Sequence, residues 1–210
     1  LIQGNVDNAI TSGSFQFQDP WYVKSDGTQP GNYWIPCTAA YEPNGKDGAS
    51  EKGIFLDQII EEGQPYYSVK VDAVQDFYLS QTGKTHKFYF QSWGYDQNKV
   101  TLQNPTLNET PVVFNQEGAI ITANLKGTQL SNQTNAYSNT SQRRFVQTPD
   151  GVKHICYESM NKVWYELSTD NGTTWTLGNG GKPLSSADAK NPSMSFYANT
   201  IGIVWQEKSG

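Results

Sequence analysis

The sequence predicts an all-β fold, and three observations lead to that prediction. Aromatic residues make up 13% of the chain, charged residues only 17%, and glycine occurs 19 times. Aromatic side chains favour strands, whereas glycine, asparagine and proline favour the tight turns between strands. Short alternating or aromatic runs, each bounded by turn residues, recur along the chain. The length of 210 residues is compatible with two or three small domains or with one large β domain.

Charge and hydropathy disfavour two classes of partner. The formal net charge is −5 and the sequence has no basic run, so we expect no nucleic acid partner. No apolar run approaches the roughly 18–20 residues of a membrane span, and no signal-peptide pattern occurs, so we expect no membrane span. The chain starts at Leu1 without a methionine, which is compatible with a leader that has already been removed.

Residues 1–64 are predicted to form a β-rich, sandwich-like N-terminal region. Turn signals such as Asp19-Pro20 separate strand candidates at 14–18 and 32–35. The run 55–62 fits two turns of helix or a strand equally well.

The candidate ligand-binding residues are aromatic. Trp21, Tyr33 and Trp34 lie in the turn-rich N-terminal region, and Tyr95 follows a predicted strand. Rings presented on loops stack on sugars or anchor a protein partner. The alternative is that these rings belong to the core of a β protein that is short of leucine.

Residues 65–127 contain regularly spaced strand candidates, at 66–74, 76–79, 87–93, 110–114 and 118–125. They carry, in order, Phe88-x-Phe90-x-x-Trp93, Asn104-Pro105-Thr106, Val112-Val113-Phe114 and Ala119-x-x-x-Ala123-Asn124-Leu125. This order resembles the divergent internalin B-type repeat of bacterial surface proteins, although the stretch 94–99 is shorter and lacks the usual Gly-Asp pair after the tryptophan. The resemblance implies a small β-grasp-like module that acts as a spacer or in adhesion.

A linker is predicted at 128–141, because this stretch is polar and small and offers only Leu130 and Tyr137 for burial. Residues 142–210 then form the last region. Strands are predicted there at 144–147, 152–158 and 162–167, with a fourth near 174–177.

The strand pattern then restarts at 192–196 and 201–207. Ile203-Val204-Trp205-Gln206 follows Ile155-Cys156-Tyr157-Glu158 by 48 positions, a spacing typical of repeated four-stranded sheets. The sequence therefore predicts one complete sheet and the first half of another.

The turn before the fourth strand carries the octet Ser168-Thr169-Asp170-Asn171-Gly172-Thr173-Thr174-Trp175. We expect Asp170 to accept hydrogen bonds from backbone N–H groups, Gly172 to supply a positive φ, and Trp175 to bury its ring. The pattern Ser-x-Asp-x-Gly-x-Thr-Trp resembles the Asp-box of the sialidase-type (BNR) repeat, a secreted β-propeller signature. The resemblance implies one and a half propeller blades in residues 142–210 and structural roles for Ser168, Asp170, Gly172, Thr174 and Trp175.

One and a half blades cannot close a ring, because blades bury their faces on neighbouring blades. Three interpretations stay open. The chain is a fragment of a longer secreted protein, the ordered part of one, or a protomer that completes its sheets with strands from another chain.

No catalytic residue is predicted. Sialidases of this family clamp the substrate carboxylate with three arginines, whereas this chain has only Arg143 and Arg144. Neighbours on a strand point to opposite faces, so these two cannot form that clamp. Carboxylates such as Glu158 and Glu166 are available, but sequence alone does not give the separation of roughly 5–10 Å that an acid and a nucleophile need.

The sequence predicts no metal site or other cofactor. Neither His86 nor His154 belongs to a cluster of histidines and cysteines with metal-ligand spacing. Calcium bound through Asp47 or Asp188 is a weaker alternative, since neither lies in an EF-hand or nonapeptide spacing. The two cysteines, Cys37 and Cys156, are compatible with a disulfide or with two unrelated buried thiols.

These observations predict a secreted or cell-surface protein with a non-catalytic role in structure, adhesion or glycan binding. The expected partners are another copy of the chain, a different surface protein or a polysaccharide. The alternative is the N-terminal part of a secreted glycoside hydrolase whose catalytic residues lie outside this chain.

Overall fold

The structure is a computed structural model that describes residues 2–6, 15–18, 34–37, 67–79, 82–116, 119–133, 135–137 and 141–208. Strands and turns account for almost all of these residues, and the one helical element among them is the short 3₁₀ turn η1 (Asn179–Gly181). The predicted all-β class is therefore confirmed. The described part of the chain contains no helix that is long and apolar enough to cross a bilayer.

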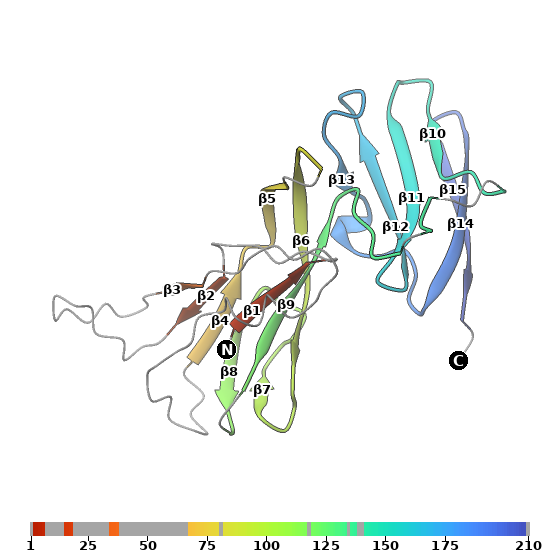
Figure 1. Cartoon of the computed structure of the whole chain (residues 1–210). Helices are drawn as coiled ribbons and strands as arrows, with labels where there is room; N and C mark the ends of the chain where they lie inside the picture. Colours follow the sequence, from red (N-terminus) through yellow and green to blue (C-terminus); the bar gives the residue numbers. More distant parts are fainter. Residues whose placement is uncertain are drawn as a thin grey trace. The chain divides into compact units, whose positions relative to one another are not determined.

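The chain divides into two compact units (Figure 1). The first unit comprises Leu1–Gln75 and Tyr89–Lys126, and the second comprises Asp76–Phe88 and Gly127–Gly210. The division falls within three strands: β5 (Val74–Leu79), β6 (Lys84–Tyr95) and β9 (Ile121–Gly127).

The first unit is built on two sheets. One has the order β3-β2-β4-β8-β7, and all its strands pair antiparallel. The other has the order β1-β9-β6-β5, in which β1 pairs with β9 in parallel. The remaining strands of these two sheets are β1 (Ile2–Val6), β2 (Phe15–Gln18), β3 (Trp34–Cys37), β4 (Tyr67–Val71), β7 (Val100–Leu102) and β8 (Glu109–Phe114).

Strands from both sides of residue 64 share these sheets. β2 pairs with β4, and β1 pairs with β9, so the N-terminal region and residues 65–127 are joined by backbone hydrogen bonds. Among the described side chains of this unit, Phe90 and Trp93 are buried, with ring centroids 5.2 Å apart. The Trp93 Nε1–H donates to the Leu107 carbonyl at 2.8 Å. The predicted domain limits stay a prediction.

The second unit contains a four-stranded antiparallel sheet in chain order, β10-β11-β12-β13. Its strands are β10 (Phe145–Gln147), β11 (Lys153–Ser159), β12 (Lys162–Ser168) and β13 (Thr176–Leu177). A separate hairpin of β14 (Ala189–Tyr197) and β15 (Thr200–Glu207) follows. The predicted order of four strands and then two is confirmed, although the fourth strand is shorter than predicted.

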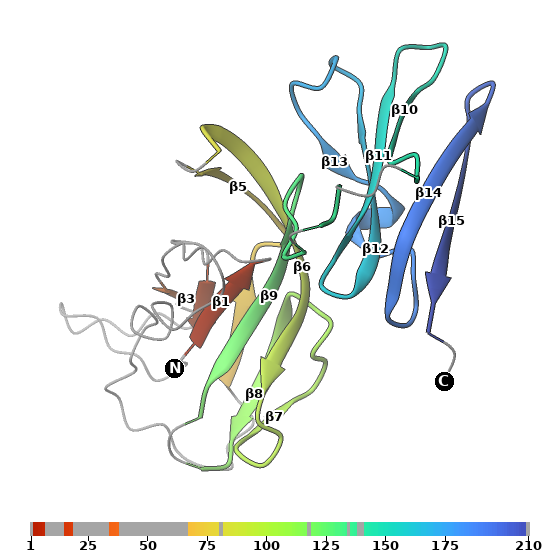
Figure 2. The same ribbon diagram turned by 45° about the vertical axis from the view of Figure 1, so that its right-hand side comes forward.

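The hairpin packs against one face of the four-stranded sheet (Figure 2). Val146, Cys156 and Met194 form the buried cluster between them. Partly buried side chains from both sheets complete it, namely Tyr165, Ile201 and Ile203. Because side chains alternate along a strand, those on the opposite face of the sheet point away from the hairpin and pack against another part of the chain.

Residues 128–133 and 135–137, here called the segment 128–137, include most of the predicted linker and lie against that opposite face. The Gln129 N–H donates to Glu166 Oε1 at 2.8 Å, and Ser131 Oγ donates to the Glu158 carbonyl at 2.5 Å. The rings of Tyr137 and Tyr157 lie with centroids 5.3 Å apart. Both faces of the sheet are therefore in contact with other parts of the second unit, and the described residues form no closed ring of sheets.

Candidate functional site

The Asp-box turn joins β12 to β13 and is held together by its own side chains. Asp170 Oδ1 accepts from Ser168 Oγ at 2.8 Å and from the Thr174 N–H at 2.9 Å. Asp170 Oδ2 accepts from Thr174 Oγ1 at 2.6 Å. Both carboxylate oxygens are therefore engaged within the turn, which leaves Asp170 poorly suited to acid or base chemistry.

Gly172 and Trp175 complete the turn. Gly172 has a φ of 91°, a conformation that costs a residue with a Cβ considerably more than glycine. Its N–H donates to Ser168 Oγ at 2.8 Å, and its carbonyl accepts from Trp175 Nε1 at 3.2 Å. The Trp175 side chain is buried, at 8% exposed. The five motif residues thus contact one another rather than a cavity.

Hydrogen bonds from the Thr174 side chain, the Thr174 backbone and Ser168 lower the pKa of Asp170 to about 2. The pKa of an unfolded aspartate is higher, so folding favours the ionised carboxylate. The stabilisation that Asp170 gives is therefore complete above pH 3.8, the ordinary value, and is lost as the pH falls towards 2.

We expect Asp170→Asn to flatten the acid side of the stability profile. Asparagine keeps one acceptor oxygen but does not titrate, so the melting temperature should fall less between pH 4 and pH 2 than in the wild type. Asp170→Ala should lower the melting temperature by several degrees at pH 7, because it removes both carboxylate acceptors from the turn. Thermal unfolding followed by circular dichroism measures both effects.

The control is Asp72→Asn, at an exposed aspartate whose carboxylate accepts no hydrogen bond among the described residues. It should leave the profile unchanged. An equal flattening in Asp72→Asn and Asp170→Asn would contradict the role assigned to the Asp-box carboxylate.

Of the predicted stacking aromatics, only Tyr95 is described with its side chain. Trp21 and Tyr33 lie outside the described residues, and Trp34 is described only by its backbone, at the start of β3. Tyr95 ends β6 and lines a small pocket of about 290 Å³ together with Lys99 and Ile120. Its role in stacking stays a prediction.

The two histidines have structural hydrogen-bond partners. His86 Nδ1 lies 2.7 Å from the Thr128 carbonyl, and its Nε2 lies 2.8 Å from Thr82 Oγ1. His154 Nδ1 lies 2.7 Å from Tyr165 Oη. Burial lowers the pKa of His154, which favours the neutral ring.

Cys156 is a buried free thiol between the two sheets of the second unit. Burial raises its pKa to about 11, so little nucleophilic thiolate is present near neutral pH. Cys37 is described only by its backbone in β3.

We expect Cys156 to resist alkylation in the folded protein. Iodoacetamide at pH 8 should leave the peptide that contains Cys156 unmodified, and the same reagent in urea should alkylate it completely. Peptide mass mapping measures both states, with the urea sample as the positive control. Rapid alkylation of Cys156 under native conditions would contradict its burial.

Arg144 is buried beside a carboxylate. It is 8% exposed, and its Nη2 lies 3.3 Å from Glu158 Oε1 and donates to Gln142 Oε1 at 2.7 Å. Its exposed neighbour Arg143 accepts, through its carbonyl, a hydrogen bond from the Met194 N–H. The two arginines lie just before β10, one buried and the other exposed, so their side chains do not converge on one binding site.

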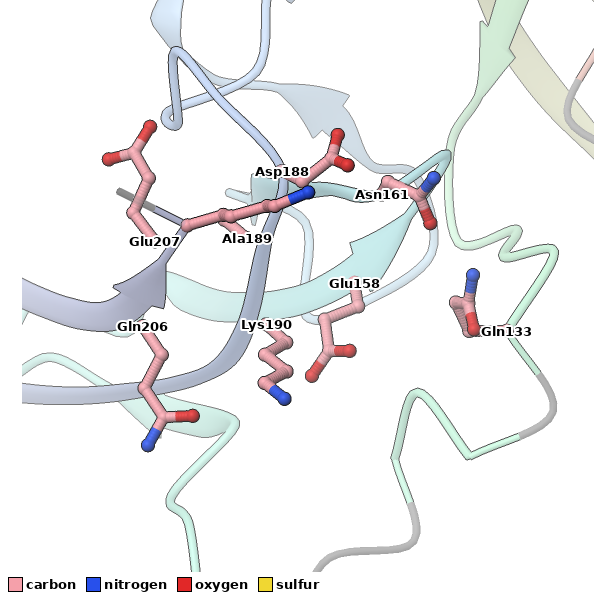
Figure 3. A pocket seen from close by; sticks show the side chains of 9 residues that line it. Gln133, Glu158, Asn161, Asp188, Ala189, Lys190, Gln206 and Glu207 are labelled. Carbon is pink, nitrogen blue, oxygen red and sulfur yellow. The ribbon is translucent and has the colours of Figure 1, made fainter. Parts of the chain in front are cut away.

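A polar pocket of about 600 Å³ lies in the second unit, where the ends of β11 and β15 meet the start of β14 (Figure 3). Figure 3 shows Asn161 beside Asp188, and Glu158 between Lys190 and Gln133 in this view. The lining residues are Gln133, Glu158, Asn161, Asp188, Ala189, Lys190, Gln206, Glu207 and Lys208. Sequence reasoning missed this pocket, because its residues come from four separate segments with no motif.

Two carboxylates of the polar pocket are held in place by the protein. Glu158 Oε1 accepts from the Asn191 N–H at 2.6 Å as well as from Arg144. Glu207 Oε1 accepts from the Ala187 N–H at 2.6 Å. Hydrogen bonds from Ala187, Ser186 and Trp205 lower the pKa of Glu207 to about 2, so it is ionised at neutral pH.

The described residues contain no group of three or more histidine, cysteine, aspartate or glutamate side chains placed to hold a metal ion. Asp188, the described calcium candidate, lines the polar pocket, and Asp47 lies outside the described residues. Comparison with known proteins found no matching family model, no similar curated protein and no similar solved structure.

Proposed function

We propose that the chain is a non-catalytic extracellular module for adhesion, surface structure or glycan binding. The observation that carries the proposal is the Asp-box turn, which fastens β12 to β13 and uses its carboxylate entirely within the turn. A motif of this kind stiffens a sheet rather than supplying a reactive group.

The second unit is proposed to be the start of an Asp-box propeller. On this proposal β10 to β13 form one blade, and β14 with β15 forms the first half of the next. Two features support it: the four strands pair in chain order, and the hairpin packs on one face of that sheet. A third supporting feature is that the sequence pattern of β11 recurs in β15, 48 positions later. An internalin-repeat-like module within residues 65–127 remains part of the proposal.

Catalysis and binding are tested on the same purified protein. We expect no release of fluorophore from 4-methylumbelliferyl sialoside or the matching neutral glycosides, and retention of the protein on at least one insoluble polysaccharide such as cellulose, xylan or chitin. Turnover of any glycoside would overturn the proposal in favour of a glycoside hydrolase.

Self-association can be tested with the purified chain alone, without any other partner. Sedimentation velocity over a hundredfold range of concentration should reveal species heavier than the 23.4 kDa chain. A single 23.4 kDa species at every concentration would remove the second copy as a partner and leave a different surface protein or a polysaccharide.

A further inference from the structure

We infer that the polar pocket of the second unit binds a neutral saccharide. The inference rests on the proposed extracellular role and names the ligand class and the site. The volume of about 600 Å³ falls within the range of roughly 300–1,000 Å³ that is usual for small-molecule sites.

The pocket offers fixed acceptors. Asn191 and Arg144 hold one oxygen of Glu158, and the other has no hydrogen-bond partner among the described residues. Glu207 is held by the Ala187 N–H, by Ser186 Oγ at 2.9 Å and by Trp205 Nε1 at 3.2 Å. Acceptors whose orientation the protein has already set lose little conformational entropy when a ligand binds.

The pocket also offers free hydrogen-bonding groups. The side chains of Gln133, Asn161, Asp188 and Lys190 make no hydrogen bond to any other described residue. Gln206 Oε1 accepts from Asn191 Nδ2 at 2.8 Å, which leaves its amide N–H groups available. Donors and acceptors are therefore both present in the lining of one cavity.

The charges select among ligand classes. The three carboxylates (Glu158, Asp188 and Glu207) and two ammonium groups (Lys190 and Lys208) nearly balance, so the lining gives neither an anion nor a cation a strong net attraction. A charged lining is also a poor environment for an apolar ligand. Hydroxyl groups donate to carboxylates and accept from ammonium and amide groups, so a neutral polyhydroxylated ligand can hydrogen-bond to both kinds of lining group.

The test is a set of ¹H–¹⁵N NMR titrations with cellotetraose, mannotetraose and chitotetraose, and with 3′-sialyllactose as an anionic comparison. At least one neutral tetrasaccharide should shift the amide signals of Asn161, Asp188 and Lys190. Asp188→Ala and Gln206→Ala should each weaken that binding at least about tenfold, since each removes hydrogen bonds to the ligand. Both side chains are exposed, so the melting temperature should not change.

The matched control is Asp72→Ala, which removes an exposed aspartate from the first unit and should bind like the wild type. The inference is overturned if no neutral tetrasaccharide shifts the pocket signals, if sialyllactose binds more tightly, or if Asp188→Ala binds as well as Asp72→Ala. If the protein is retained on an insoluble polysaccharide but the amide signals of the pocket residues do not shift, this site is overturned and the proposed function stands. Hydrolysis of a tetrasaccharide would overturn the proposed function itself.

Discussion

Replacing Trp164 by alanine is expected to reduce the free energy of unfolding by about 3–5 kcal/mol, the usual cost of removing a large buried aromatic side chain. Trp164 lies in β12, is 2% exposed, and stands directly opposite Tyr157 of β11 in the sheet register. Its Nε1–H also donates to the Ser159 carbonyl at 2.7 Å. The substitution therefore removes packing and one hydrogen bond to a buried carbonyl. Urea unfolding followed by circular dichroism measures the loss.

The matched control for this experiment is Trp205→Ala, in β15 of the hairpin. Trp205 is only partly buried, and its Nε1–H donates to the carboxylate of Glu207 at 3.2 Å. We expect it to cost about 1 kcal/mol or less. Trp164→Phe should fall between the two, because it keeps a ring and loses the hydrogen bond. A larger loss for Trp205→Ala than for Trp164→Ala would contradict the placement of the core.

Local patterns predicted the strands of the second unit well. The runs 152–158 and 162–167 are β11 and β12 within a residue or so, and 201–207 is β15. Alternation along each run reflects which side chains face a neighbouring sheet, so it can be read from one segment alone. The fourth strand was predicted too long because Trp175 belongs to the Asp-box turn, where its Nε1–H bonds to Gly172.

Pairings between distant segments could not be read in the same way. The parallel pairing of β1 with β9 places Ile2 opposite Ile121, and the sequence around either residue gives no indication that the two segments pair. The polar pocket was missed for the same reason: Glu158 and Asp188 were recognised only as single carboxylates, and the fold alone places them around one cavity. Polar composition likewise predicted a linker where Gln129 and Ser131 bond to the sheet.

The second large effect is expected at Glu166, which joins the segment 128–137 to the sheet. Glu166 lies in β12 and is 0% exposed, and its Oε1 accepts from the Tyr157 hydroxyl and, at 2.8 Å, from the Gln129 N–H. Alanine would remove this acceptor from the buried Tyr157 hydroxyl and the partly buried Gln129 N–H, at a cost of about 1–3 kcal/mol for each donor. We therefore expect Glu166→Ala to reduce the free energy of unfolding by about 2–5 kcal/mol.

A conservative variant separates the hydrogen bonds from the side-chain volume. Glu166→Gln keeps an acceptor oxygen and nearly the same size, so it should lose less than half of what Glu166→Ala loses. Tyr157→Phe removes one of the two donors, and its effect should be smaller in the Glu166→Ala background than in the wild type, because the two residues share a hydrogen bond.

Hydrogen exchange at Gln129 decides whether 128–137 is a linker or part of the packed unit. In the wild type its amide should exchange slowly, because the N–H is bonded to the buried Glu166. In Glu166→Ala the Gln129 amide should exchange much faster than in the wild type. The Cys156 N–H donates to the Arg144 carbonyl, so its exchange should quicken only as much as the lower free energy of global unfolding requires. Equally fast exchange of the Gln129 amide in both proteins would mean that the segment behaves as the sequence predicted. The sheet face that carries Glu166 would then be open to another partner.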